Sequence, residues 1–73
     1  MSMSIDKKKG DKVIVTTQSI QNGTMFDQLE ADAYLKIGKK YTIEKIEPHD
    51  FHTNVWVKEV PGIRFNSVLF DDL

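Results

Sequence analysis

The chain has 73 residues, a formal net charge of −1 and no cysteine. A chain this short forms one domain with a thin core, and without cysteine it can contain neither disulfides nor thiolate metal sites. Its near-zero net charge creates no overall field that would attract nucleic acid or an acidic membrane surface.

Residues 1–10 are small, polar and rich in lysine, so we expect a flexible arm ahead of a single domain over residues 11–73. The arm lacks the apolar region of a secretory signal. No stretch of the chain approaches the ~20 apolar residues that a membrane span needs. These features predict a cytoplasmic protein without membrane contact. A solvated tail explains the lysines most simply, and a nucleic-acid-binding arm is the alternative.

Residues 12–17 predict the first strand, because β-branched residues dominate this segment. Val13 and Val15 alternate with Ile14 and Thr16, so both faces of the strand carry an apolar side chain. We therefore expect this strand to lie inside the sheet.

A long connection over residues 18–38 follows and holds one candidate helix, over residues 25–33. Thr24 is a suitable N-cap. Phe26, Leu29 and Ala33 would share one face of that helix at spacings i, i+3 and i+7. An ordered loop is the alternative, because so short a helix is marginal by itself.

Residues 39–46 and 54–60 predict the next two strands. Ile46 breaks the alternation of the apolar residues before it, which indicates a β-bulge near residues 44–45. Such a bulge would bend the strand, as a small barrel requires.

The end of the chain predicts a short strand, a single turn and a last strand. Pro61-Gly62 is typical of a type II turn, in which glycine takes a positive φ. Residues 63–65 then form the short strand, with a turn capped by Ser67 and a closing segment over residues 70–73.

Four short segments follow one another along residues 10–72, and their order and spacing form a pattern. They are Gly10-Asp11-Lys12-Val13, Gly38-Lys39-Lys40-Tyr41-Thr42-Ile43, Lys58-Glu59-Val60-Pro61-Gly62 and Phe65-Asn66-Ser67-Val68-Leu69-Phe70. This pattern resembles small SH3-like barrel proteins of bacteriophages and bacteria. The resemblance implies a mostly β fold, a five-stranded and partly open barrel with a long first loop and a short 3₁₀ turn before the last strand. The first long loop lacks the tyrosine-rich motif with which SH3 domains hold polyproline, so the resemblance carries the fold and not the ligand.

The only cluster that could bind a metal is His49, Asp50 and His52. Solvated loop side chains are the simpler interpretation, and a pH-sensitive contact is a third. No serine stands in a nucleophile motif and cysteine is absent. We therefore expect no enzymatic activity, no metal and no cofactor.

The aromatic residues favour a protein-binding role. Trp56 falls on the strand face opposite Val55 and Val57, so inward valines would leave the indole exposed beside Lys58. Exposed tryptophan beside a cation is typical of interface hot spots. In the alternative, Trp56 packs under the long loop against Phe26 or Tyr34. The predicted protein-binding residues are Trp56, Lys58, Arg64, Phe26 and Tyr34.

The sequence therefore predicts a small non-catalytic interaction module that binds an unidentified protein partner. The resemblance adds the expectation of a modulator of host proteins, encoded by a phage or another mobile element, in the host cytoplasm. One alternative is a nucleic-acid-binding barrel that uses basic residues, and another is a structural accessory that is a monomer or a weak homodimer. The predicted nucleic-acid-binding residues are Lys7, Lys8, Lys9, Lys12, Lys39 and Lys40.

Overall fold

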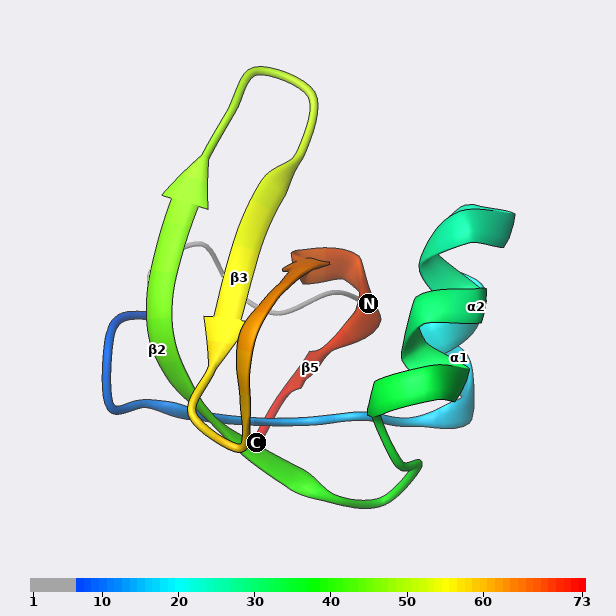
Figure 1. The fold of residues 1–73 in the computed structure, drawn as a ribbon, viewed down its shortest axis with the longest axis horizontal. Helices are drawn as coiled ribbons and strands as arrows, with labels where there is room; N and C mark the ends of the chain where they lie inside the picture. The colour runs from blue at the N-terminus through cyan, green and yellow to red at the C-terminus, as the bar shows by residue number, and fades with distance from the viewer. Residues whose placement is uncertain (1–6) are drawn as a thin grey trace.

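The structure, a computed structural model, describes residues 7–73, so most of the predicted flexible arm lies outside the described residues. Five antiparallel strands form one sheet in the order β4-β3-β2-β1-β5, and two helices stand beside it (Figure 1). Within residues 7–73, neither helix is long and apolar enough to cross a bilayer. The elements are β1 (Lys12–Ile14), α1 (Thr17–Gln21), α2 (Met25–Tyr34), β2 (Lys40–Pro48), β3 (Thr53–Val57), β4 (Val60–Asn66), η1 (Ser67–Leu69) and β5 (Asp71–Asp72).

The predicted mostly β fold is confirmed, with five strands and a 3₁₀ helix before the last one. The pair Val13↔Asp72 places the last strand beside the first, so β1 lies inside the sheet, as expected. β4 and β5 are the two edges of the strand order and do not pair with each other. The sheet is therefore open.

The core lies between the curved sheet, α2 and η1. The rings of Phe65 and Phe70 meet edge to face, with centroids 5.9 Å apart. Tyr41 is fully buried, and its hydroxyl accepts the backbone N–H of Lys36 at 2.9 Å. The buried apolar side chains are Val13, Val15, Ala31, Leu35, Tyr41, Ile43, Val55, Val57, Phe65, Leu69 and Phe70.

The first strand is shorter than predicted, because a capping box ends it. The backbone N–H of Thr16 donates to the hydroxyl of Ser19 at 2.8 Å, and the N–H of Ser19 donates to the hydroxyl of Thr16 at 2.9 Å. This reciprocal pair satisfies two N–H groups at the start of α1, a helix that we did not predict. The Thr-x-x-Ser spacing was the signal for it.

The predicted helix is confirmed as α2, which begins after an N-cap at Thr24. The predicted apolar face does not turn toward the core, since Phe26, Leu29 and Ala33 are all exposed. Ala31 is buried instead, and α2 packs through this side of the helix against β4 and η1. The small side chain of Ala31 lets α2 approach β4 closely, and the bulky apolar side chains of Phe26 and Leu29 project outward.

The predicted bulge in the second strand is confirmed. The register runs from Ile43↔Val57 to Lys45↔Trp56, which leaves Glu44 as the extra residue. β2 then continues to Pro48, two residues further than predicted, and forms a long hairpin with β3. The bulge increases the local twist of this hairpin.

The predicted turn at Pro61-Gly62 is wrong, because the pair Val57↔Val60 places the turn at residues 58–59. The register then moves to Val55↔Phe65, so residues 61–64 bulge opposite Trp56. Proline has no N–H to pair, and an edge strand tolerates this loss. Gly62 takes the expected positive φ, at 81°. An edge strand with a glycine in it can therefore accommodate this bulge.

The last turn is capped by Asn66 rather than by Ser67. The backbone N–H of Val68 donates to the side-chain oxygen of Asn66 at 3.2 Å, and Ser67 is the buried first residue of η1.

Candidate functional site

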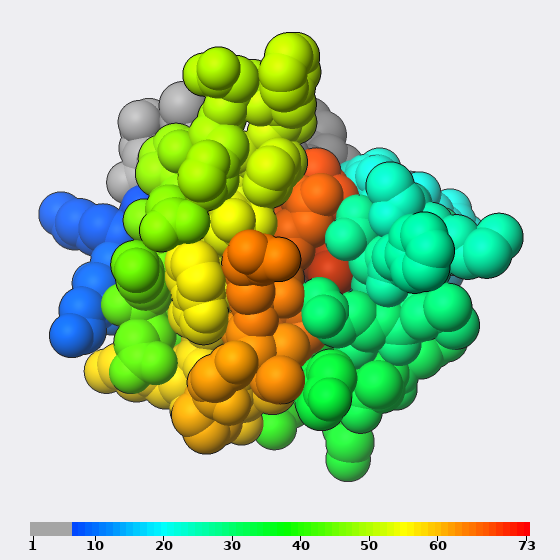
Figure 2. Space-filling view, turned by 45° about the horizontal axis from the view of Figure 1, so that its top comes forward, coloured from blue at the N-terminus to red at the C-terminus, as the bar shows by residue number. Residues whose placement is uncertain are grey.

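A groove of about 890 Å³ lies between α2 and the sheet, and Figure 2 shows it as a recess beside the β2–β3 hairpin. Three segments build this α2–β4 groove: the first two turns of α2, the β2–β3 hairpin, and β4 with its bulge. The lining residues are Phe26, Asp27, Glu30, Glu47, His49, His52, Asn54, Trp56, Gly62, Ile63, Arg64, Phe65 and Asn66.

Trp56 is half-buried on the sheet side of the groove. The ammonium of Lys45, its register partner on β2, lies 4.9 Å from the centroid of the indole. The tryptophan therefore has a neighbouring cation, but this cation is Lys45 and not the predicted Lys58. A cation over an indole face is attracted by the ring quadrupole.

The structure brings three of the five predicted protein-binding residues together. Phe26, Trp56 and Arg64 all line the α2–β4 groove, and Phe26 is 84% exposed. Lys58 lies in the β3–β4 turn and Tyr34 at the end of α2, and neither lines the groove. The ring of Tyr34 packs edge to face on Phe65 with centroids 6.4 Å apart, because the end of α2 closes over β4.

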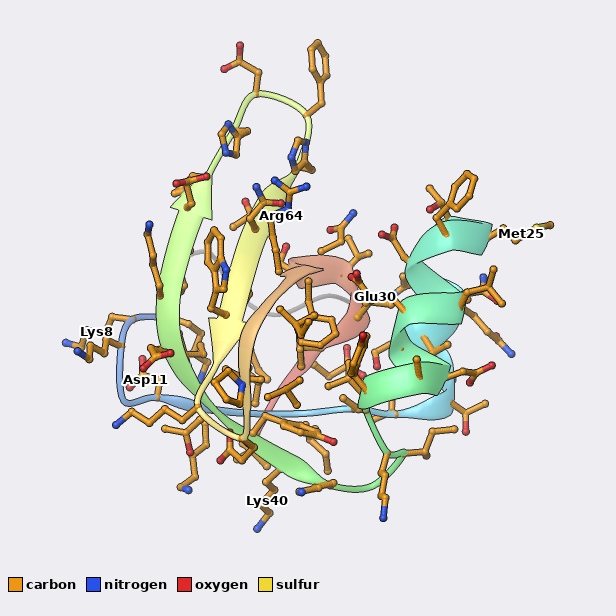
Figure 3. The ribbon with its side chains drawn as sticks, in the orientation of Figure 1. Lys8, Asp11, Met25, Glu30, Lys40 and Arg64 are labelled. Carbon is orange, nitrogen blue, oxygen red and sulfur yellow. The ribbon has the colours of Figure 1, made fainter. Side chains whose placement is uncertain are left out.

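Two opposite charges stand on opposite walls of the groove: Figure 3 shows Glu30 on α2 and Arg64 on β4. Within residues 7–73, neither side chain makes a hydrogen bond or an ion pair. Burial raises the pKa of Glu30, and the nearby carboxylate of Asp27 raises it further, while the guanidinium of Arg64 opposes both effects. Both charges are therefore available to a ligand.

The hairpin end of the groove carries a satisfied polar cluster. The carboxylate of Glu47 lies 2.9 Å from the ring nitrogen of His49 and 3.7 Å from the ammonium of Lys45. The hydrogen bond with His49 is the largest cause that lowers the pKa of Glu47, and Lys45 and Asn54 add to it against a smaller effect of burial. The rings of His49 and His52 stack with centroids 5.0 Å apart.

The candidate metal ligands do not form a site. Among residues 7–73, no group of three or more histidine, aspartate or glutamate side chains is arranged to hold a metal ion. His49 instead pairs with Glu47, and Phe51 at the hairpin tip is 97% exposed.

The predicted nucleic-acid-binding lysines do not line the groove. Figure 3 places Lys8 beside Asp11 and Lys40 at the start of β2. The backbone N–H of Lys8 donates to Asp11, and the ammonium of Lys12 donates to the hydroxyl of Thr42 at 3.3 Å. Lys39 lies 5.3 Å from the centroid of the Tyr41 ring. Lys7 and Lys9 belong to the same N-terminal segment as Lys8, which is tied to β2 by a bond from the N–H of Gly10 to the carbonyl of Ile43.

Sequence reasoning missed the polar residues of the groove. Glu30, Glu47 and Asn54 belong to three different elements, and Asn54 is buried although it is polar. No spacing along the chain relates them, because only tertiary packing brings α2 beside β4.

No curated protein matches the chain, and no solved structure matches it. One family model does match, over residues 12–73, a range that contains every strand and both helices. Its description is bacteriophage T4 protein Y07B, which supports the predicted bacteriophage origin. The chain is thus a small β protein that belongs to the family of bacteriophage T4 protein Y07B.

Proposed function

We propose that this protein is a small non-catalytic interaction module that binds a protein partner in the α2–β4 groove. One observation carries the proposal: a half-buried tryptophan and a phenylalanine that is 84% exposed line the same open groove of a small domain. Exposed apolar side chains rimmed by polar residues are typical of interaction sites on soluble proteins.

The fold agrees with this proposal. Its five strands, the long connection after β1 and the 3₁₀ helix before β5 are features that the resemblance to SH3-like barrels implies. The long connection that would hold a ligand in such a barrel is occupied here by α1 and α2. We therefore propose an SH3-like module whose binding wall is a helix.

The composition of the groove favours a protein over a nucleic acid. Trp56 is a residue type enriched at interface hot spots, and charged side chains line the groove with it. Carboxylates from Asp27, Glu30 and Glu47 also line the groove and would repel a phosphate backbone. As a phage protein, such a module would act on a protein of the infected host cell, in its cytoplasm.

The test is affinity capture with the full chain from a lysate of the host bacterium, with and without nuclease, followed by mass spectrometry. We expect one protein that is retained after nuclease treatment. Phe26→Ser should abolish its capture. Ile37→Ser is the matched control, because Ile37 is 60% exposed and does not line the groove.

Two results would contradict the proposal. Recovery that disappears with nuclease would indicate nucleic acid, and equal effects of the two variants would place the interface elsewhere. Sedimentation at two concentrations separates a third outcome, in which the captured partner is a second copy of this chain.

A further inference from the structure

We infer that the α2–β4 groove selects a protein segment in which a lysine or arginine stands next to an apolar side chain, with the basic group paired to Glu30 and the apolar group between Phe26 and Trp56. This inference rests on the proposed function and specifies the chemistry of the partner.

The charge of the groove is the first argument. Three carboxylates line it, from Asp27, Glu30 and Glu47, against the guanidinium of Arg64 and the ammonium of Lys45, which lies over Trp56 and beside Glu47. A cationic segment is complementary to the two carboxylates of α2, whereas an acidic segment would meet like charges there.

Of these three carboxylates, Glu30 is the only one that makes no hydrogen bond or ion pair within residues 7–73, although the charge of Arg64 on the facing wall acts on it. Asp27 accepts the backbone N–H of Thr24 at 3.0 Å and the side-chain amide of Asn66 at 3.3 Å. Glu47 is held by His49, as described above. A cation from a ligand can therefore pair with the carboxylate of Glu30, which is half-buried on the wall of the groove.

Apolar surface lies directly beside this carboxylate. Phe26 precedes Glu30 by four residues in α2, so the two side chains are neighbours on one face of the helix. Trp56 lies on the facing sheet wall. The methylene stem of a lysine or arginine can cover an apolar ring while its charged end reaches a carboxylate. Adjacent basic and apolar side chains on a segment match this arrangement.

Arg64 makes the proposal falsifiable, since it stands in the same groove with the opposite charge. Removing Arg64 should leave the affinity for a basic segment unchanged or increase it. Removing the charge of Glu30 should decrease it. An acidic segment or an oligonucleotide would produce the opposite pattern.

The test selects random 12-residue peptides against the full chain and then titrates the most enriched peptide. Trp56 is the only tryptophan of the chain, so its fluorescence reports binding in the groove. We expect enrichment of lysine or arginine beside apolar residues. Glu30→Gln should weaken the enriched peptide about 10-fold, in the range of close charge pairs at interfaces. Asp32→Asn is the matched control, because Asp32 is an exposed carboxylate of α2 outside the groove.

Several results would overturn the inference. These are enrichment of acidic peptides, loss of binding on Arg64→Ala, an effect of Glu30→Gln no larger than that of Asp32→Asn, and tighter binding of a 12-nucleotide single-stranded DNA than of any peptide. The proposed function, binding of a protein partner in the groove, is tested by a different readout. If Phe26→Ser still abolishes peptide binding, the groove remains a protein-binding site with another preference, and if no peptide is enriched, both proposals fall.

Discussion

The hydroxyl of Ser19 donates a hydrogen bond to the carbonyl oxygen of Leu69, 2.8 Å away, and so joins α1 to η1 across 50 positions of the chain. Both residues are fully buried. The same hydroxyl accepts a hydrogen bond from the backbone N–H of Thr16, the N-cap of α1. One side chain therefore ends the first strand, starts the helical segment and attaches this segment to the end of the chain.

Ser19→Ala should lower the free energy of unfolding by about 2 kcal/mol, because it removes a capping bond and leaves a buried carbonyl oxygen without a donor. Urea denaturation followed by Trp56 fluorescence measures the effect. Thr17→Ala, at an exposed position of the same helix, should change the stability by less than about 0.5 kcal/mol. Equal losses in both variants would show that the Ser19–Leu69 bond does not stabilise the fold.

Glu30→Gln should leave the folded protein as stable as the wild type or stabilise it by up to about 0.5 kcal/mol at about pH 7, since solvent screens a half-buried carboxylate. Burial and Asp27 raise the pKa of Glu30, so its ionisation opposes folding above that raised pKa. The difference should disappear as the pH falls below the pKa of glutamate in the unfolded chain, at about pH 4. Thermal unfolding of the wild type and the variant at about pH 7 and below about pH 4 measures this difference in stability. A clear loss of stability at neutral pH would assign Glu30 a structural role instead of a binding one.

Glu59→Gln should destabilise the protein near neutral pH by about 1 kcal/mol or less, given the exposure of the side chain. Its carboxylate accepts the backbone N–H of Thr42 at 2.8 Å and the Thr42 hydroxyl at 2.9 Å. Burial alone would raise the pKa of Glu59, but these hydrogen bonds and the charge of Lys12 lower it overall.

Because the pKa of Glu59 is lower in the folded protein, its contribution is present above the unfolded-state pKa and is lost as the pH falls through the lowered value. Denaturation at about pH 7 and at about pH 3 should therefore show a difference between wild type and Glu59→Gln only at the higher pH. Glu44→Gln, at an exposed position of β2, should show no such difference. A loss that persists in acid would exclude the carboxylate as its cause.

Gly62→Ala should cost about 1 kcal/mol, because a side chain disfavours the positive φ of 81° at this position. A β-carbon there would meet no atom within 4 Å, so the cost comes from the backbone and not from a clash. The variant should also shift the Trp56 fluorescence, since the bulge that holds Gly62 lies opposite the indole. An unchanged spectrum and stability would show that the bulge does not depend on glycine.

Local sequence patterns were sufficient to predict the structure where neighbouring residues alone determine the conformation of a segment. Thr24 and Asp27 form a capping box, so the start of α2 was predictable from neighbouring residues. The bulge after Ile43 was also predictable, because a period of two residues cannot be kept with Ile46 in the same core. The positive φ of Gly62 followed from its residue type.

The predictions failed where distant segments compete for the same position. Residues 58–62 contain two possible turns, and pairing with β3 selected residues 58–59. The helix face that faces inward was decided by how closely α2 approaches β4, and this contact selected Ala31 over Phe26. Hydrophobicity alone favoured the larger side chain.

By itself, then, the sequence determined a mostly β domain, its capped helix and the apolar strand faces, because these depend on residue types a few positions apart. Only the tertiary structure decided the α2–β4 groove. Phe26, Glu30, Trp56 and Arg64 come from three elements, and no regular spacing along the chain relates them. They meet because a small alanine holds α2 against an edge strand that bulges, a relationship that exists only after the chain has packed.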